Sequence, residues 1–180
     1  FVLLSKYYHK LQFERDETMN KQEIYDFLKN KDIWYEITEH KAVFKMDELN
    51  GIYLPYKEYN AKNLFVRDDK KRNYYLITVK GNKRVDLKDF RNKNGTRPLS
   101  FASENDLMNI TNLIAGSVTP FGLLNDNDLK VTFCLDKDFF NDKGIIGVHP
   151  NDNTATVWLK AVDLTKIIQE HGNMVNIVEL

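Results

Sequence analysis

The chain has 180 residues, of which 42% are hydrophobic and 29% are charged, a composition that is ordinary for one soluble globular domain. Its formal net charge is zero, so the overall charge favours neither a nucleic-acid nor a membrane partner. A single cysteine, Cys134, excludes an internal disulfide and favours a reducing, cytoplasmic setting. No apolar run reaches the roughly 18 residues that a membrane-spanning helix needs.

The charge is unevenly distributed along the chain. Between Lys57 and Arg97 there are 13 Lys and Arg residues against 5 Asp and Glu residues, whereas between Pro98 and Leu180 there are 5 against 11. A basic stretch of this kind is typical of a phosphate-facing surface, although a cluster of solvated basic loops would give the same pattern. The sequence therefore leaves nucleic-acid binding open.

The first predicted element is a helix. Asn20 followed by Glu23 is a capping-box pattern, and the helix should end near residues 29–31. The other elements predicted before residue 99 are a strand at 33–37, a helical turn at 46–49, strands at 62–67 and 73–80 joined by a hairpin connection at 68–72, a turn at 81–82, and a helix at 86–92 stopped by Gly95.

The second half of the chain alternates between short strands and helices. Its predicted elements are a strand at 99–101, a helix capped by Ser103 that runs to about Leu113, an ordered turn at 115–125, a strand at 131–135, a hairpin pair at 145–148 and 154–159, a helix at 161–171 ended by Gly172, and a strand at 174–178. Strands outnumber helices and often adjoin. This predicts a single α/β (α+β) domain with a mixed, mainly antiparallel sheet surrounded by helices.

The domain is expected to occupy residues 19–180. Met19 stands directly before the first helix start, so residues 1–18 are interpreted as an N-terminal extension, either an upstream segment or one introduced by cloning. The chain lacks a Gly-x-Ser-x-Gly elbow, a P-loop and a Gly-x-Gly-x-x-Gly motif. One cysteine and four scattered histidines predict no structural zinc site, and Cys134 within an apolar strand is expected to be a core residue.

Three segments carry the candidate chemistry. Lys62 opens a mostly apolar strand, where an ammonium can bind a phosphate or stabilise developing negative charge. Gly116 and Gly122 permit a turn whose backbone N–H groups can receive a carbonyl or hydroxyl oxygen. His149 ends a strand, where an imidazole can orient a hydroxyl or transfer a proton. Each segment alone fits an ordinary structural explanation as well: a solvated edge lysine, a connector, or a solvated turn histidine.

Together and in this order, these segments resemble the YbaK/ProX family of prolyl-tRNA editing domains. The matching pieces are Tyr35-Glu36, Glu39-His40, the Lys62–Asp68 strand, Lys83-Arg84-Val85-Asp86-Leu87, Leu99-Ser100-Phe101-Ala102, Gly116–Pro120, and Gly147–Thr156. The resemblance covers residues 19–180 and is stronger to the free-standing ProX branch, which clears alanine, than to the YbaK branch, which clears cysteine.

The resemblance implies a compact α/β domain with a central, barrel-like mixed sheet. It places catalytic roles on Lys62 and His149. It places substrate binding on Asn63, Gly116, Ser117, Val118, Thr119, Pro120 and Asn151. In this family the substrate ester joins an amino acid to the terminal ribose of the tRNA. The ribose hydroxyl next to this ester is thought to help activate water, so a protein nucleophile is not required.

The function that the resemblance implies is trans-editing: hydrolysis of the ester of mischarged proline tRNA, with alanyl-tRNA(Pro) as the preferred substrate. The alternatives are cysteinyl-tRNA(Pro) or another small-amino-acid ester, and a non-catalytic tRNA-binding module of the same fold. The expected partner is the acceptor end of aminoacylated proline tRNA, with prolyl-tRNA synthetase or an elongation factor as further candidates. We expect a cytoplasmic monomer that uses neither cofactor nor metal and does not bind membranes.

Overall fold

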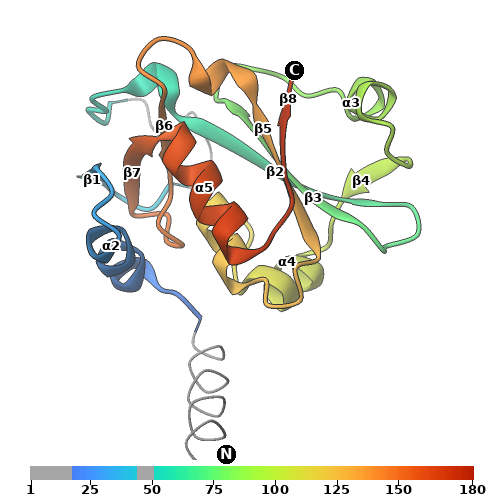
Figure 1. Cartoon of the computed structure of the whole chain (residues 1–180), viewed down its shortest axis with the longest axis horizontal. Helices are drawn as coiled ribbons and strands as arrows, with labels where there is room; N and C mark the ends of the chain where they lie inside the picture. Colours follow the sequence, from blue (N-terminus) through green and yellow to red (C-terminus); the bar gives the residue numbers. More distant parts are fainter. Residues whose placement is uncertain (1–17, 44–50) are drawn as a thin grey trace, which may run out of the picture.

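The computed structural model describes residues 18–43 and 51–180 (Figure 1). Its helices and strands are α2 (Lys21–Asn30), β1 (Tyr35–Glu39), β2 (Ala61–Asp68), β3 (Tyr74–Lys80), α3 (Leu87–Asn94), β4 (Leu99–Phe101), α4 (Glu104–Thr111), β5 (Val131–Asp136), β6 (Ile145–Val148), β7 (Ala155–Lys160), α5 (Ala161–His171) and β8 (Val175–Val178). Within these residues, short 3₁₀ helices lie at Lys57–Tyr59, Pro120–Asn125 and Lys137–Phe140. The helical turn predicted at 46–49 and nearly all of the extension predicted at 1–18 lie outside the described residues.

The strands form two sheets. The five-stranded sheet has the order β4-β2-β3-β5-β8, and the three-stranded sheet has the order β1-β7-β6. β3, β5 and β8 run parallel to one another, and the other strand pairs are antiparallel. An isolated parallel bridge between Asn60 and Gly147 joins the two sheets. The predicted mixed α/β fold with mainly antiparallel pairing is thus confirmed, and its sheet is divided into two parts.

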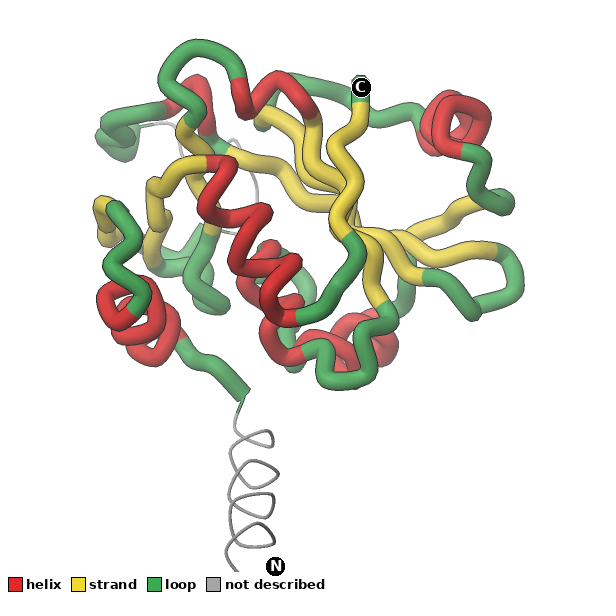
Figure 2. The backbone as a smooth tube through the Cα atoms, viewed as in Figure 1, coloured by secondary structure: helices red, strands yellow, loops and turns green. Residues whose placement is uncertain are grey.

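The main hydrophobic core lies between the two sheets and the helices. α5 crosses one face of the five-stranded sheet, and α4 lies near the end of that sheet (Figure 2). Phe121, Phe133 and Leu164 are fully buried in this core. A smaller cluster around Phe90 of α3 covers the other face of the five-stranded sheet. Among residues 18–43 and 51–180, no helix is both long enough and apolar enough to cross a bilayer.

Local signals in the sequence explain where the helices begin and end. At α2 the Glu23 N–H donates to Asn20 Oδ1 at 3.1 Å, and the Asn20 N–H donates to Glu23 Oε2 at 2.7 Å. Ser103 and Asp106 make the same reciprocal cap at α4. Such caps stabilise a helix by about 1 kcal/mol each. α5 ends where Gly172 adopts φ 117°, which favours glycine.

Candidate active site

The start of β2 is where the three predicted segments meet. Asn60 bridges to Gly147 at the end of β6. Three residues further along, the Asn63 Nδ2 donates to the Val118 carbonyl oxygen at 3.0 Å. The Thr119 hydroxyl donates to the His149 carbonyl oxygen at 2.6 Å. The structure therefore brings Asn63, the loop at 116–119 and the turn at His149 side by side.

The loop at 116–120 has backbone donors that the fold leaves available. Gly116 adopts φ 89°, a conformation that favours glycine. The Ser117 N–H already donates to the Ile114 carbonyl oxygen at 3.1 Å, and Ser117 is 5% exposed. The N–H groups of Gly116 and Val118 have no acceptor within the described part of the chain. Pro120 then begins the buried 3₁₀ helix that fixes the end of the loop.

Asn63 is held from two sides. Its Oδ1 accepts a hydrogen bond from the hydroxyl of the fully buried Thr78 at 2.7 Å, while its Nδ2 binds Val118. An amide has two N–H donors and two acceptor lone pairs, so one of each remains. Asn63 thus fixes the loop to the sheet and can still contact a ligand.

His149 is fixed by a hydrogen bond at Nδ1. Its Nδ1 lies 2.8 Å from the Ala155 carbonyl oxygen. Because a carbonyl oxygen only accepts, Nδ1 carries a proton, and in the neutral ring Nε2 then has the free lone pair. Burial lowers the pKa of His149, and the nearby His40 ring lowers it further. The lowered pKa favours the neutral, proton-accepting form of this half-buried ring.

His40 is a site residue to which the sequence patterns assigned no role. Its ring centroid lies 6.1 Å from that of His149, and the two rings meet edge to face. Its Nδ1–H donates to the Lys41 carbonyl oxygen at 2.8 Å, and its Nε2 accepts from the Thr156 hydroxyl at 3.0 Å. The available signal was a histidine directly after an alternating strand. In the part of the chain that the structure describes, no three His, Cys, Asp or Glu side chains are grouped to hold a metal.

Lys62 lies on the same strand as Asn63 but on the other face. Successive strand residues point to opposite faces, so Lys62 shares its face with Val66 and the α3 side of the sheet. Its Nζ donates to the Lys83 carbonyl oxygen. Burial lowers the pKa of Lys62, and the neighbouring Arg84 lowers it further. Across the described residues, no hydrogen bond joins Lys62 to His149 or to the loop.

Lys83, whose carbonyl oxygen accepts the hydrogen bond from Lys62, is itself held by a cluster of charged groups. Lys83 Nζ lies 2.6 Å from Asp136 Oδ2 and 2.6 Å from Asp138 Oδ2, and it donates to the Leu180 carbonyl oxygen at 2.7 Å. Asp136 is fully buried at the end of β5. Hydrogen bonds from Lys83 to both carboxylates raise the pKa of Lys83, although burial opposes them. This Lys83 cluster holds the turn after β3 against β5 and the C-terminus.

Asn151 occupies a different place from the other predicted site residues. It adopts φ 59°, and its Nδ2 donates to the Met19 carbonyl oxygen at 2.7 Å. Its Oδ1 is buried without a hydrogen-bond partner among the described residues. Asn151 thus ties the turn after His149 to the start of α2, and its predicted substrate contact stays a prediction.

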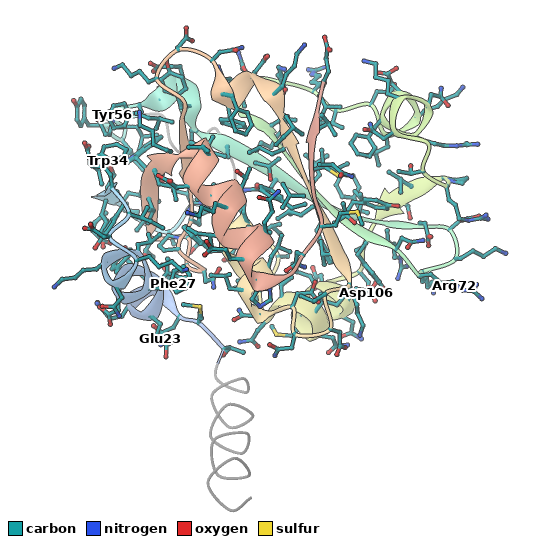
Figure 3. All side chains as sticks on the ribbon, in the orientation of Figure 1. Glu23, Phe27, Trp34, Tyr56, Arg72 and Asp106 are labelled. Carbon is teal, nitrogen blue, oxygen red and sulfur yellow. The ribbon has the colours of Figure 1, made fainter. Side chains whose placement is uncertain are left out.

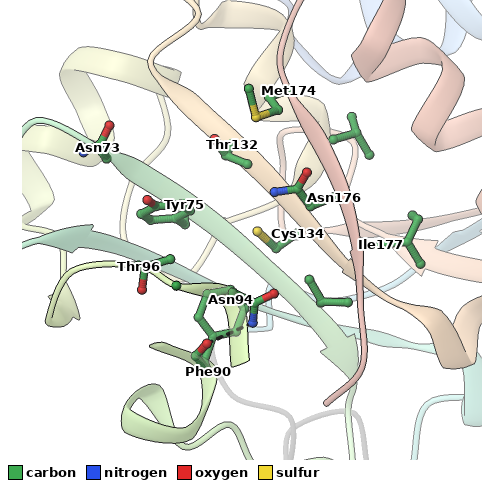
Figure 4. A pocket seen from close by; sticks show the side chains of 13 residues that line it. Asn73, Tyr75, Phe90, Asn94, Thr96, Thr132, Cys134, Met174, Asn176 and Ile177 are labelled. Carbon is green, nitrogen blue, oxygen red and sulfur yellow. Dashed lines mark hydrogen bonds between the residues drawn. The ribbon is translucent and has the colours of Figure 1, made fainter. Parts of the chain in front are cut away.

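A cavity beside β8 lies away from these residues. It encloses about 570 Å³ on the α3 side of the five-stranded sheet, beside β8 (Figure 4). Asn94, Asn176 and other uncharged side chains line it, together with Tyr75 and Cys134. Burial raises the pKa of Cys134 to about 12 and also raises that of Tyr75. This cavity therefore offers no charged group, base or thiolate for hydrolysis near neutral pH.

Comparisons with known proteins identify relatives that are described as tRNA-editing proteins. A family model described as the aminoacyl-tRNA editing domain matches residues 40–167. The chain is 39% identical over 160 residues to the prolyl-tRNA editing protein ProX of Acetoanaerobium sticklandii, and the alignment covers 89% of this chain and 97% of that protein. It is 32% identical over 143 residues to prolyl-tRNA synthetase associated domain-containing protein 1 of Mus musculus, covering 77% of this chain and 83% of that protein.

A solved structure supports the same fold. The crystal structure of a proposed trans-editing enzyme for prolyl-tRNA synthetase superposes with a TM-score of 0.59 at 20% sequence identity. The superposition covers 81% of this chain and 87% of that one, and at this identity it shows the fold alone. From the family model and the sequence relatives, the chain belongs to the aminoacyl-tRNA editing domain family, as a YbaK/ProX-type prolyl-tRNA editing domain.

Proposed function

We propose that this chain is a trans-editing aminoacyl-tRNA deacylase that hydrolyses mischarged proline tRNA, with alanyl-tRNA(Pro) as its preferred substrate. The family match and the relative named as a prolyl-tRNA editing protein support the reaction class. The observation that carries the proposal is His149, a half-buried imidazole whose Nδ1 is held by the Ala155 carbonyl oxygen, placed beside a loop with available N–H donors.

The reaction needs a proton acceptor and donors for an oxyanion. In our proposal, His149 Nε2 accepts a proton from water or from the neighbouring ribose hydroxyl, and a water oxygen bonds to the ester carbonyl carbon. The tetrahedral intermediate then expels the ribose oxygen, which takes up a proton, and the amino acid is released. The N–H groups of Gly116 and Val118 stabilise the oxyanion, because they are the loop donors without an acceptor in the described chain.

Lys62 binds the phosphate or ribose of the terminal nucleotide in this proposal. It is the second residue of β2, at the end of the strand, and its ammonium lies on the other face from Asn63. The substrate would therefore cross the start of β2, with its phosphate near Lys62 and its ester near His149. Asn63 and Ser117–Pro120 would border the aminoacyl group.

Selectivity has a physical basis in size. A synthetase pocket built for proline cannot strongly exclude the smaller alanine, because each missing methylene costs only about 1–3 kcal/mol of discrimination. A second site that admits only small side chains removes the error and rejects correct prolyl-tRNA. We propose that the protein acts in the cytoplasm as a monomer, and that prolyl-tRNA synthetase or an elongation factor supplies its substrate.

Deacylation of alanyl-, cysteinyl- and seryl-tRNA for proline, each with the native protein and with Lys62→Ala, tests the proposal. We expect fastest release of alanine and loss of that activity in the variant at unchanged thermal stability. Fastest release of cysteine would instead assign the cysteine substrate. Near-normal turnover by Lys62→Ala would contradict the role of this lysine, and tRNA binding without hydrolysis would identify a non-catalytic module.

A further inference from the structure

At the tip of the β2–β3 hairpin, both acidic side chains already accept hydrogen bonds from other residues of the fold. Asp68 is 1% exposed and accepts the Arg72 N–H at 2.9 Å and the Asn73 Nδ2 at 2.6 Å. Asp69 accepts two hydrogen bonds from Arg97, at 2.6 and 2.9 Å. These contacts lower the pKa of both aspartates, so both carboxylates are committed to the fold at neutral pH.

The basic side chains of the same tip have no such commitment. Lys70, Lys71 and Arg72 are exposed, and no carboxylate lies within ion-pair distance of them in the described chain. The Lys71 N–H donates to the Asp68 carbonyl oxygen at 3.0 Å, and Lys71 adopts φ 56°, so the backbone of the tip is fixed. With Arg97 and both aspartates counted, four cations face two carboxylates, a net charge of +2.

Some other cations of the basic stretch are paired with carboxylates of the fold. Arg67 pairs with Asp106, Lys83 pairs with Asp136 and Asp138, and Lys93 pairs with Asp89. A basic residue that already holds a carboxylate has less to gain from a phosphate. Arg84, Lys88 and Arg91 are also exposed without an ion pair in the described chain, but they are spread over the turn before α3 and over α3 itself. The three cations at the tip are consecutive in sequence, so they form a compact group that can bind an external anion.

The tip is also distant from the candidate active site. Asp68 lies six positions after Lys62 on β2, which corresponds to about 20 Å along the strand at roughly 3.3 Å per residue. Figure 1 shows the hairpin projecting from the end of the sheet opposite to β6, and Figure 3 shows Arg72 at its outer end. A group bound at the tip cannot be the terminal nucleotide held at Lys62.

We propose that Lys70, Lys71 and Arg72 form a second contact with RNA, which binds backbone phosphates of the base-paired acceptor arm while the aminoacylated end occupies the active site. The inference rests on the proposed function. A contact with the phosphate backbone of RNA fits this tip, because exposed lysine and arginine side chains bind phosphates without reading the base sequence. An acidic protein partner fits less well, because interfaces between proteins are centred on buried apolar or aromatic anchors and the tip exposes no large apolar side chain.

The test removes the three charges at once. Lys70→Gln/Lys71→Gln/Arg72→Gln is compared with Lys29→Gln/Lys130→Gln/Lys166→Gln, which removes the same charge from exposed positions outside the basic stretch. Two substrates are used: full-length alanyl-tRNA(Pro) and a short single-stranded oligonucleotide that ends in the same alanylated adenosine. Binding of uncharged proline tRNA is measured in parallel across a series of salt concentrations.

For the tip variant we expect a KM for the full-length tRNA raised about tenfold at low salt, and a salt slope of log Kd smaller by about 2.7 for three lost contacts with phosphates of a duplex. Its kcat, and its kinetics on the short substrate, should match those of the native protein. An unchanged slope and KM, or an equal loss on both substrates, would overturn the inference. If the native protein hydrolyses neither substrate, the proposed function fails, and the binding slope still decides the role of the tip.

Discussion

The two ends of the β2–β3 hairpin use charge in opposite ways. At the active-site end, Lys62 binds a backbone carbonyl and Lys83 is held by Asp136 and two further oxygen ligands. At the tip, Arg72 and the two lysines before it are exposed and make no ion pair. The nearby carboxylates of Asp68 and Asp69 are bound by other groups of the protein. At the active-site end, the charged groups are held in a fixed geometry, and their desolvation opposes this. At the tip, the charges stay in water and can attract an anion over a longer distance.

Catalysis provides the largest test of this difference. His149→Gln should lower kcat for deacylation by about 10²- to 10⁴-fold, because it removes the proposed proton acceptor. Lys70→Gln, at the other end of the hairpin, should leave kcat unchanged. Single-turnover deacylation of alanyl-tRNA(Pro) measures both. A His149→Gln variant as fast as the native protein would remove this histidine from the chemistry.

Substitutions at the two ends of the hairpin should also differ in their effect on the free energy of unfolding. Lys83→Met leaves the fully buried Asp136 without its cation and should lower the free energy of unfolding by about 3–5 kcal/mol. Arg72→Met should change it by less than about 0.5 kcal/mol. Urea denaturation gives both values. Adding Asp136→Leu to Lys83→Met should restore much of the loss, and failure to do so would show that the ion pair is not the cause.

Close packing at the active-site end can be probed with one methyl group. A Cβ on Gly147 would lie 2.2 Å from the ring of Trp158, which is fully buried. Gly147→Ala should therefore lower the free energy of unfolding by about 1–3 kcal/mol. Thermal denaturation that matches the native protein would mean that the Trp158 ring can move aside.

The smallest expected effect is a dependence of stability on pH. Burial lowers the pKa of His149 in the folded state below its ordinary value of 6.5. The unfolded chain therefore takes up the proton first, and stability should fall as the pH drops below about 6.5, by at most about 1.4 kcal/mol per pH unit for one proton. The slope should be smaller in His149→Gln. An equal slope in both proteins would assign the effect to other groups.

The sequence predicted the elements whose causes are local. The capping pair Asn20 and Glu23, the stop at Gly172 and the hairpin at 68–72 all have signals within a few residues, and all are confirmed. The division into two sheets and the parallel run of β3, β5 and β8 depend on pairings between distant segments, which periodicity does not encode.

The same distinction holds for the candidate site. The loop at 116–120 and the turn at His149 could be found in the sequence because glycine and proline mark them. The Lys83 cluster could not, because Asp136 lies 53 positions further along the chain and looks like an ordinary strand-end residue. His40 was missed for the same reason, since only folding brings its ring to His149.

The amide of Asn63 has a consequence for motion. Thr78, Asn63 and Val118 form one continuous line of hydrogen bonds from the middle of the sheet to the loop. Because these hydrogen bonds tie the loop to a buried strand, the loop opens only when they break. We therefore expect its opening to be as rare as local opening of the sheet. In hydrogen–deuterium exchange, the Ser117 amide, which donates to the Ile114 carbonyl oxygen, should therefore be protected, and Asn63→Ala should speed its exchange without unfolding the strand.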